Sequence, residues 1–282
     1  MPIAHISDTA RWVAVYRAME TDRPDAIFRD PFARRLAGIK GEEIVDSIRR
    51  GRQMAWAMIV RTAVFDEIIL ERVRTGVDLV VNLAAGLDAR AWRLPLSPDL
   101  RWVDVDLPDI LRYKTETLPD ATPVCRYEAI AADLTDPGTR ATLFARLGAE
   151  ARSVLVVTEG LLVYLTDEQV GALARDLHSA PSFRWWVIDL ASPELLRMIT
   201  RMWGKSVQPG NAAFRFAPAD GTAFFRRFGW RELEFRSSLD EARRLRREMR
   251  MMWLRRFIVR LSPAKRREEV RRMSGIVLLE RL

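Results

Sequence analysis

Residues 79–88 read Leu79-Val80-Val81-Asn82-Leu83-Ala84-Ala85-Gly86-Leu87-Asp88, an apolar run that ends in small and polar residues. This pattern is typical of a buried parallel strand that turns tightly into a helix. Polar residues follow or lie in three later apolar runs: Asp104-Val105-Asp106, Ala132-Asp133-Leu134 and Glu159-Gly160-Leu161-Leu162-Val163-Tyr164-Leu165. Because an open α/β sheet binds ligands beyond the carboxyl ends of its strands, the four strings predict one shared binding site.

Strands and helices alternate after residue 78. The first five strands are expected at 79–83, 101–105, 126–131, 154–158 and 185–190, and the helices between them at 107–118, 139–147 and 167–177. Such alternation favours a parallel sheet with right-handed crossovers. Two later strands, at 230–236 and 275–280, are expected to add an antiparallel hairpin. The predicted fold class is therefore α/β, with a mostly parallel seven-stranded sheet flanked by helices.

The residues before this sheet read as helical. We expect one helix at 10–20 and a longer one that begins at Gly51, with a proline-containing connector between them. No low-complexity linker or internal repeat is present. We therefore expect a single domain, in which residues 1–77 form a helical cap over the active site and residues 78–282 form the core.

Composition excludes several classes of protein. The chain has no run of about eighteen apolar residues, so no membrane-spanning helix is expected. Its N-terminus lacks the basic and then apolar stretch of a signal peptide. The single cysteine, Cys125, excludes an internal disulfide and most cysteine metal sites. We expect a cytoplasmic protein without a metal site.

The formal net charge is +8, and the excess gathers as arginines in the last quarter of the chain. One interpretation is a surface for nucleic acid, which would make the chain an RNA-binding or RNA-modifying protein. The other is the solvated face of a long helix, because Leu245, Met249 and Met252 recur at helical spacing between the charges. We favour the helix face and expect a small-molecule partner, with the oligomeric state left open.

The strand ends carry groups that suit a nucleoside. A carboxylate in Asp104-Val105-Asp106 can accept hydrogen bonds from both hydroxyls of a ribose, or it can cap the next helix. Asp133 can accept from the amine of an adenine whose ring face Leu134 covers, or it too can be a helix cap. Glu159 would be costly to bury without a partner, and an amino acid's ammonium would supply one. The turn after the first strand has one glycine, Gly86, whereas a nicotinamide-binding enzyme would have the three glycines of a G-x-G-x-x-G motif. Binding of a dinucleotide is therefore disfavoured.

These strings, together with Trp92-Arg93-Leu94 and Leu107-Pro108, resemble those of leucine carboxyl methyltransferases and their bacterial relatives. The relatives include carboxyl O-methyltransferases that tailor polyketides. Three strings nearer the N-terminus also resemble the bacterial branch of this family: Arg17-Ala18-Met19-Glu20, Asp30-Pro31-Phe32-Ala33 and Arg61-Thr62. The resemblance spans about residues 9–177 and implies a class I, Rossmann-like fold that binds S-adenosyl-L-methionine.

The resemblance also implies roles for individual residues. In this family an arginine before the first strand holds the methionine carboxylate, and Arg61 matches it. The cofactor-binding residues it implies, in chain order, are Arg61, Ala84, Gly86, Asp106, Asp133, Leu134 and Glu159. Asp106 would bind the ribose, Asp133 and Leu134 the adenine, and Glu159 would stand at the methionine end. The family usually has Gly where this chain has Ala84, which adds a methyl group beside the cofactor.

The methyl acceptor is expected to be a carboxylate of a small secondary metabolite. A carboxylate is already ionised at neutral pH, whereas a phenol profits from a general base. The chain has only two histidines, His5 and His178, so base candidates are scarce. A phenol or hydroxyl of an aromatic natural product is the alternative acceptor. Tyr16, Arg17 and Tyr164 are candidates for acceptor contacts, although core packing and a salt bridge would equally explain Tyr16 and Arg17.

Overall fold

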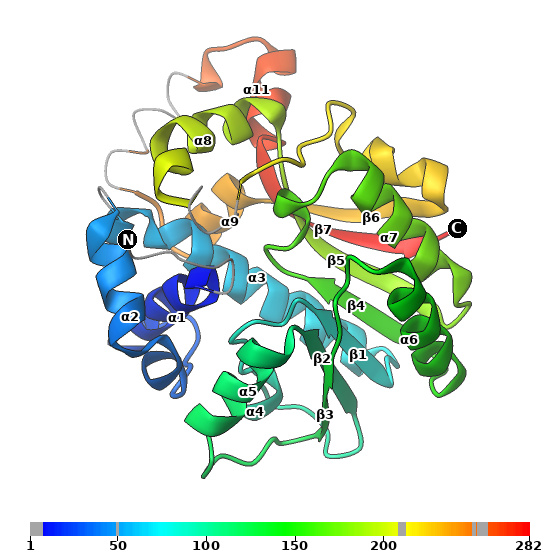
Figure 1. The fold of residues 1–282 in the computed structure, drawn as a ribbon. Helices are drawn as coiled ribbons and strands as arrows, with labels where there is room; N and C mark the ends of the chain where they lie inside the picture. The colour runs from blue at the N-terminus through cyan, green and yellow to red at the C-terminus, as the bar shows by residue number, and fades with distance from the viewer. Residues whose placement is uncertain (1–7, 49–50, 208–212, 250–251, 253–258) are drawn as a thin grey trace.

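One seven-stranded sheet forms the centre of the fold. The computed structural model describes residues 8–48, 51–207, 213–249, 252 and 259–282. The strands are β1 (Leu79–Leu83), β2 (Arg101–Asp106), β3 (Arg126–Ala131), β4 (Val154–Thr158), β5 (Phe183–Ala191), β6 (Trp230–Ser237) and β7 (Ser274–Arg281). Their order is β3-β2-β1-β4-β5-β7-β6, with β1 to β5 parallel and β7 antiparallel to both of its neighbours. The predicted α/β sheet is confirmed (Figure 1).

Helices cover both faces of this sheet (Figure 1). One face carries α6 (Pro137–Ala149), α7 (Asp167–Ser179) and the 3-10 helix η4 (Gly221–Phe228). The other face carries α3 (Ala55–Arg74), α4 (Arg90–Arg93) and α9 (Ser238–Arg244). Within the described ranges, no helix is both long and apolar enough to cross a membrane.

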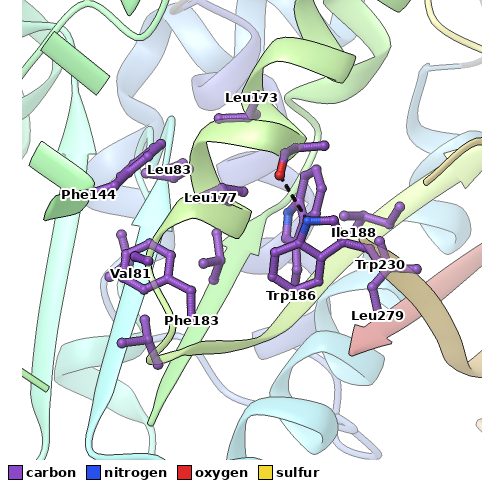
Figure 2. Close-up of a cluster of buried hydrophobic side chains, with 14 of the residues drawn as sticks. Val81, Leu83, Phe144, Leu173, Leu177, Phe183, Trp186, Ile188, Trp230 and Leu279 are labelled. Carbon is purple, nitrogen blue, oxygen red and sulfur yellow. Dashed lines mark hydrogen bonds between the residues drawn. The ribbon is translucent and has the colours of Figure 1, made fainter. Parts of the chain in front are cut away.

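The central strands β1 and β4 are buried at every position, because helices cover both faces of the sheet there. Along β2, Val103 and Val105 face the cluster under α6 and α7, whereas Trp102 faces the cluster under α3. Figure 2 shows the first cluster, where the fully buried indole of Trp186 donates through Nε1 to Thr158 Oγ1 at 2.9 Å. The sheet is thus held between two hydrophobic layers.

The N-terminal helices form a third cluster beside the sheet. α1 (Asp8–Thr21) and α2 (Ala33–Ser47) share it with the start of α3 and with α5 (Pro108–Thr117). The 3-10 helix η1 (Gly51–Met54) leads into α3, which also packs on the sheet through Val64, Phe65 and Ile68. We therefore keep the division into a cap of residues 1–77 and a core of residues 78–282 as a proposal, with α3 as the helix that joins the two.

Two stretches differ from the prediction. Residues 33–47, expected to be part of a connector, form α2. Pro31 lies just before this helix, where the ring does not obstruct it, and Gly38 at φ +61° kinks it. The arginine-rich stretch, expected to be one long helix, instead contains the separate helices α9 and α11 (Ala264–Arg271) in its described part, and Arg246 at φ +56° leaves the helical conformation after α9.

Lys114 of α5 is a buried charge whose partner lies in the sheet. Its Nζ is 2.5 Å from Asp104 Oδ2 in β2. The same carboxylate accepts hydrogen bonds from Trp102 Nε1 at 2.8 Å, Asn82 Nδ2 at 3.1 Å and Tyr127 Oη at 3.0 Å. Each carboxylate oxygen therefore has two donors, which is what a charge needs when it is taken out of water.

We expect the substitution Lys114→Met to lower the free energy of unfolding by about 3–5 kcal/mol, because it leaves Asp104 buried without its counter-charge. Urea unfolding followed by circular dichroism measures this change. Lys265→Met, at an exposed position of α11, is the matched control and should change the free energy by less than about 0.5 kcal/mol. A loss for Lys114→Met no larger than that of the control would show that Asp104 does not depend on this lysine.

Candidate functional site

A pocket of about 1170 Å³ opens at the carboxyl ends of β1 to β4. This is the edge where parallel α/β sheets bind ligands. The residues predicted to bind the cofactor all line it: Arg61, Ala84, Gly86, Asp106, Asp133, Leu134 and Glu159. The topology thus brings together side chains that are nearly a hundred residues apart in the chain.

The turn after β1 is tight and partly strained. Ala84 has φ +51° and Gly86 has φ +52°. Glycine adopts such values freely, whereas a residue with a Cβ atom does so at a cost of about 1–2 kcal/mol. Ala84 therefore lines the pocket at a position whose backbone conformation favours glycine.

Asp106 connects this turn to the end of β2. Its Oδ2 accepts from the Gly86 backbone N–H at 2.6 Å, and its Oδ1 accepts from the Leu107 N–H at 2.7 Å. Burial raises the pKa of Asp106, and the two backbone donors oppose that rise. The carboxylate is not a cap of α5, whose N-cap residue is Leu107 and has no side-chain cap. Asp106 lines the pocket, and each of its carboxylate oxygens has a second lone pair that no described residue uses.

Asp133 and Leu134 follow β3. Asp133 Oδ1 accepts from the Thr135 N–H at 2.8 Å and from Thr135 Oγ1 at 2.7 Å. The N-cap of α6 is Asp136, whose carboxylate accepts from Gly138 and Thr139. The helix-cap interpretation of Asp133 is therefore wrong. Its Oδ2 has no hydrogen-bond partner among the described residues, and Asp133 and Leu134 both line the pocket.

Glu159, at the end of β4, already has cationic partners. Its Oε1 is 2.9 Å from Arg61 Nε, and its Oε2 is 2.7 Å from Arg90 Nη1. Burial alone would raise the pKa of Glu159, but Arg90 and Arg61 outweigh it and hold the pKa below the usual value. The protein itself therefore supplies two guanidinium partners for this carboxylate, so burial of Glu159 does not by itself require a ligand's ammonium.

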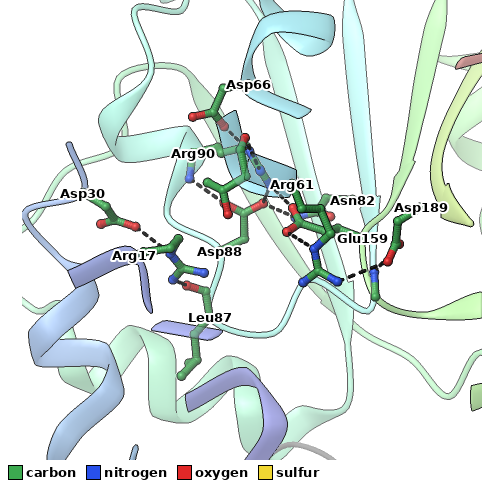
Figure 3. Close-up of polar contacts among 12 residues, drawn as sticks. Arg17, Asp30, Arg61, Asp66, Asn82, Leu87, Asp88, Arg90, Glu159 and Asp189 are labelled. Carbon is green, nitrogen blue, oxygen red and sulfur yellow. Dashed lines mark hydrogen bonds and ion pairs between the residues drawn. The ribbon is translucent and has the colours of Figure 1, made fainter. Parts of the chain in front are cut away.

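These contacts belong to a longer series of ion pairs, which we call the arginine network (Figure 3). Its members are Arg17, Arg61, Arg90 and Arg93 with Asp30, Asp66, Asp88, Glu159 and Asp189. Arg90 is its centre, since it pairs with Asp66 at 2.6 Å, Asp88 at 2.6 Å and Glu159 at 2.7 Å. The network runs from the loop before α2 to the end of β5.

Three members of this network, Arg90, Asp66 and Asp189, are absent from the sequence prediction. Asp66 interrupts the apolar pattern of α3 and accepts from Arg90 and from Arg93. Asp189 lies near the end of β5, two residues before its last residue, and it accepts from Arg61 at 3.1 Å and from the Gly160 N–H at 2.7 Å. A signal was present for Asp189, because the rule applied to the ends of the first four strands also holds for the fifth.

The three acceptor candidates lie in different environments. Tyr16 does not line the pocket; it is 1% exposed, and its hydroxyl donates to the Gly51 carbonyl at 2.7 Å. Burial raises the pKa of Tyr16 to about 12. The prediction for Tyr16 is therefore wrong, and core packing explains it. Arg17 lines the pocket but pairs with Asp30 at 2.8 Å and donates to the Leu87 carbonyl at 2.6 Å.

Tyr164 lies on the pocket wall. It belongs to the 3-10 helix η2 (Leu162–Tyr164) and packs against Phe214, with ring centroids 5.7 Å apart. Burial raises the pKa of Tyr164, so its hydroxyl stays protonated and can donate. Of the two histidines, His178 does not line the pocket, and His5 lies outside the described residues.

Comparison with known proteins agrees with this geometry. Residues 10–178, more than half of the chain, match the family model described as leucine carboxyl methyltransferase. A Mycobacterium marinum protein named "Putative S-adenosyl-L-methionine-dependent methyltransferase" is 35% identical over 182 residues, or 60% of this chain and 60% of that protein. A Parafrankia protein with the same description is 36% identical over 193 residues, or 64% of this chain and 62% of that protein. The match therefore spans less than two thirds of these relatives.

Two solved structures share the fold over nearly the whole chain. A DUF574 family protein from Streptomyces avermitilis superposes with a TM-score of 0.56 at 15% identity, covering 95% of this chain and 97% of that one. A structure titled "putative methyltransferase" from Thermobifida fusca gives a TM-score of 0.57 at 14% identity, covering 100% and 96%. With the family match over residues 10–178, the chain belongs to the leucine carboxyl methyltransferase family.

Proposed function

We propose that this chain is an S-adenosyl-L-methionine-dependent O-methyltransferase that converts the carboxylate of a small secondary metabolite into its methyl ester. The family, and the names of the relatives in Mycobacterium marinum and Parafrankia, support the methyltransferase part. The observation that carries the proposal is the meeting of Asp106, Asp133 and Arg61 in one pocket. These groups complement a ribose, an adenine and a carboxylate, which are three parts of that cofactor.

The chain's own residues suit each part of the cofactor. The free lone pairs of Asp106 can accept from the two ribose hydroxyls while its other lone pairs keep the Gly86 and Leu107 N–H groups. Arg61 uses Nε and Nη1 for Glu159 and Asp189, and its Nη2 bonds to no described residue. That nitrogen can donate to the methionine carboxylate. Glu159 and Asp189 then act on the ligand by holding Arg61 in place.

Methyl transfer from a sulfonium requires mainly that the acceptor oxygen stand in line behind the methyl carbon. S-adenosyl-L-methionine, when bound, supplies the electrophilic methyl group. The pocket walls supply orientation and exclude water, and orientation of this kind can lower a barrier by about 7–11 kcal/mol. Val13 of α1 and Trp56 of α3 line the same pocket as Asp106, so the N-terminal helices contribute to this enclosure.

Two features of the pocket favour a carboxylate acceptor over a phenol. No histidine is found among its described lining residues, and a carboxylate needs no base. Arg215 and Arg243 also line it, and neither is ion-paired with a residue that the structure describes. Cationic side chains without carboxylate partners attract an anionic substrate. Tyr164 can donate its phenolic hydrogen to an acceptor oxygen.

The substitution Asp106→Ala should weaken binding of S-adenosylhomocysteine by roughly 30-fold or more, because it removes two hydrogen bonds to a charged acceptor. Isothermal titration calorimetry measures the affinity. Asp136→Ala is the control, since Asp136 follows the same sheet edge but caps α6 outside the pocket. Equal affinity of the Asp106→Ala variant and the wild-type protein would remove Asp106 from the site.

The reaction product should be a base-labile ester. With S-adenosyl-L-methionine labelled in its methyl group and an extract of small acids as acceptor, mild base should release the label as methanol, because esters hydrolyse and aryl ethers do not. Label that survives base in the product would contradict the carboxylate and support the phenol. A heat-denatured enzyme sample controls for non-enzymatic transfer.

A further inference from the structure

The pocket is larger than the cofactor wall alone requires. Its volume of about 1170 Å³ exceeds the roughly 300–1,000 Å³ that is usual for one ligand. Beyond Asp189 the wall continues onto α8 (Pro193–Val207), onto Met249 and Met252, and onto lining residues between Val259 and Ile276. Figure 1 shows α8 and α11 side by side, and Arg266 Nη1 of α11 lies 3.8 Å from Glu194 Oε2 of α8. We call this part of the cavity the apolar chamber.

The described wall of this chamber is made mainly of aliphatic and methionine side chains. From α8 and the residues after it come Leu195, Leu196, Met198, Ile199, Met249, Met252, Val259, Val270 and Met273. Leu195 and Leu196 lie four and three residues before Ile199, so all three share one face of α8. Glu194, Arg197 and Thr200, between or beside them, are exposed.

This apolar face of α8 is not used by the protein's own core. None of the chamber residues of α8 belongs to the three hydrophobic clusters that hold the described part of the chain together. The same is true of Met249, Met252 and Met273. A helix with one apolar face is normally stabilised by covering that face. Here the face lines a cavity that continues into the proposed cofactor site.

We propose that the chamber binds the apolar body of the methyl acceptor, which is a monocarboxylic acid with an extended hydrocarbon part. The inference rests on the proposed function, because it assigns the remaining space of the same pocket to the substrate. Beyond Asp189, the arginines of the pocket wall outnumber its acids, which favours an anion, and the aliphatic side chains favour a hydrocarbon. The arginines are Arg215, Arg243, Arg266, Arg267 and Arg271, and the acids are Asp240 and Glu248. Both features together specify an amphiphilic acid.

The methionines indicate tolerance of acceptor shape. Met198, Met249, Met252 and Met273 line the chamber. Unbranched thioether side chains adapt to the shape of what they contact, and such residues are typical of surfaces that bind a range of apolar ligands. We therefore expect linear and fused-ring acids of similar size to bind with similar affinity.

Binding of straight-chain acids of increasing length tests the proposal. Isothermal titration calorimetry is carried out with butanoate, octanoate and dodecanoate, each with and without saturating S-adenosylhomocysteine. Dodecanoate should bind at least about 100-fold more tightly than butanoate, since each buried methylene is worth roughly a fourfold change in affinity. Equal or unmeasurable affinity of all three acids would overturn the proposal.

A matched pair of variants on α8 locates the binding. Ile199→Asn places an amide in the chamber and should weaken dodecanoate binding by about 10-fold or more, while leaving S-adenosylhomocysteine affinity within about twofold. Thr200→Asn introduces the same amide at an exposed position of the same helix and should leave both affinities unchanged. Unaltered dodecanoate affinity in Ile199→Asn would contradict the location.

The two proposals fail in different ways. If S-adenosylhomocysteine binds but the acids show no length dependence, the chamber proposal is wrong and the cofactor site stands. If the acids bind with the expected length dependence and S-adenosylhomocysteine does not bind, the cofactor proposal is wrong and the chamber is a site for an apolar acid.

Discussion

The whole site depends on satisfying one buried guanidinium, that of Arg90. Its nitrogen atoms lie 2.6–2.7 Å from carboxylate oxygens of Asp66, Asp88 and Glu159. A charge removed from water is tolerated only when such partners surround it, and removal of one partner is costly. The three carboxylates come from α3, from the turn after β1 and from the end of β4. Satisfying Arg90 therefore fixes three elements of the pocket relative to one another.

The network has a direct consequence for the binding groups. Glu159 holds Arg61 on one side and Asp189 holds it on the other, so the guanidinium that faces the pocket has a set orientation before any ligand arrives. The turn that includes Ala84 keeps its positive φ under the same restraint, because Asp106 binds the Gly86 N–H and Arg90 binds Asp88. Strain of this kind persists where surrounding contacts over-determine the backbone.

Much of the fold followed from the sequence because the strand pattern is strong. Apolar runs located most of the strands, and an alternating pattern located the edge strand β6. The rule that parallel sheets bind ligands at the carboxyl ends of their strands identified residues that line the pocket. The helix at 33–47 is not evident from the sequence, because the proline-containing connector predicted there includes Pro31, and a proline favours a break in a helix as readily as a position just before one. The partners of Glu159 were also missed. A sequence without the fold does not show that Arg90, Arg61 and Glu159 meet, because ion pairs between distant elements depend on topology. Tyr16 failed as a site residue for the same reason: its hydroxyl has a backbone partner that only the fold reveals.

The cofactor wall and the apolar chamber together describe a pocket whose polar end is rigid and whose apolar end is adaptable. The central claim is that the polar end of the pocket binds a nucleoside through the carboxylates of Asp106 and Asp133. A crystal structure of the protein with S-adenosylhomocysteine tests this most directly. The account predicts ribose hydroxyls within hydrogen-bond distance of Asp106 and an adenine ring beside Leu134, with its amine at Asp133. A nucleoside bound elsewhere in the cavity, with Asp106 contacting only the backbone groups of Gly86 and Leu107, would contradict it.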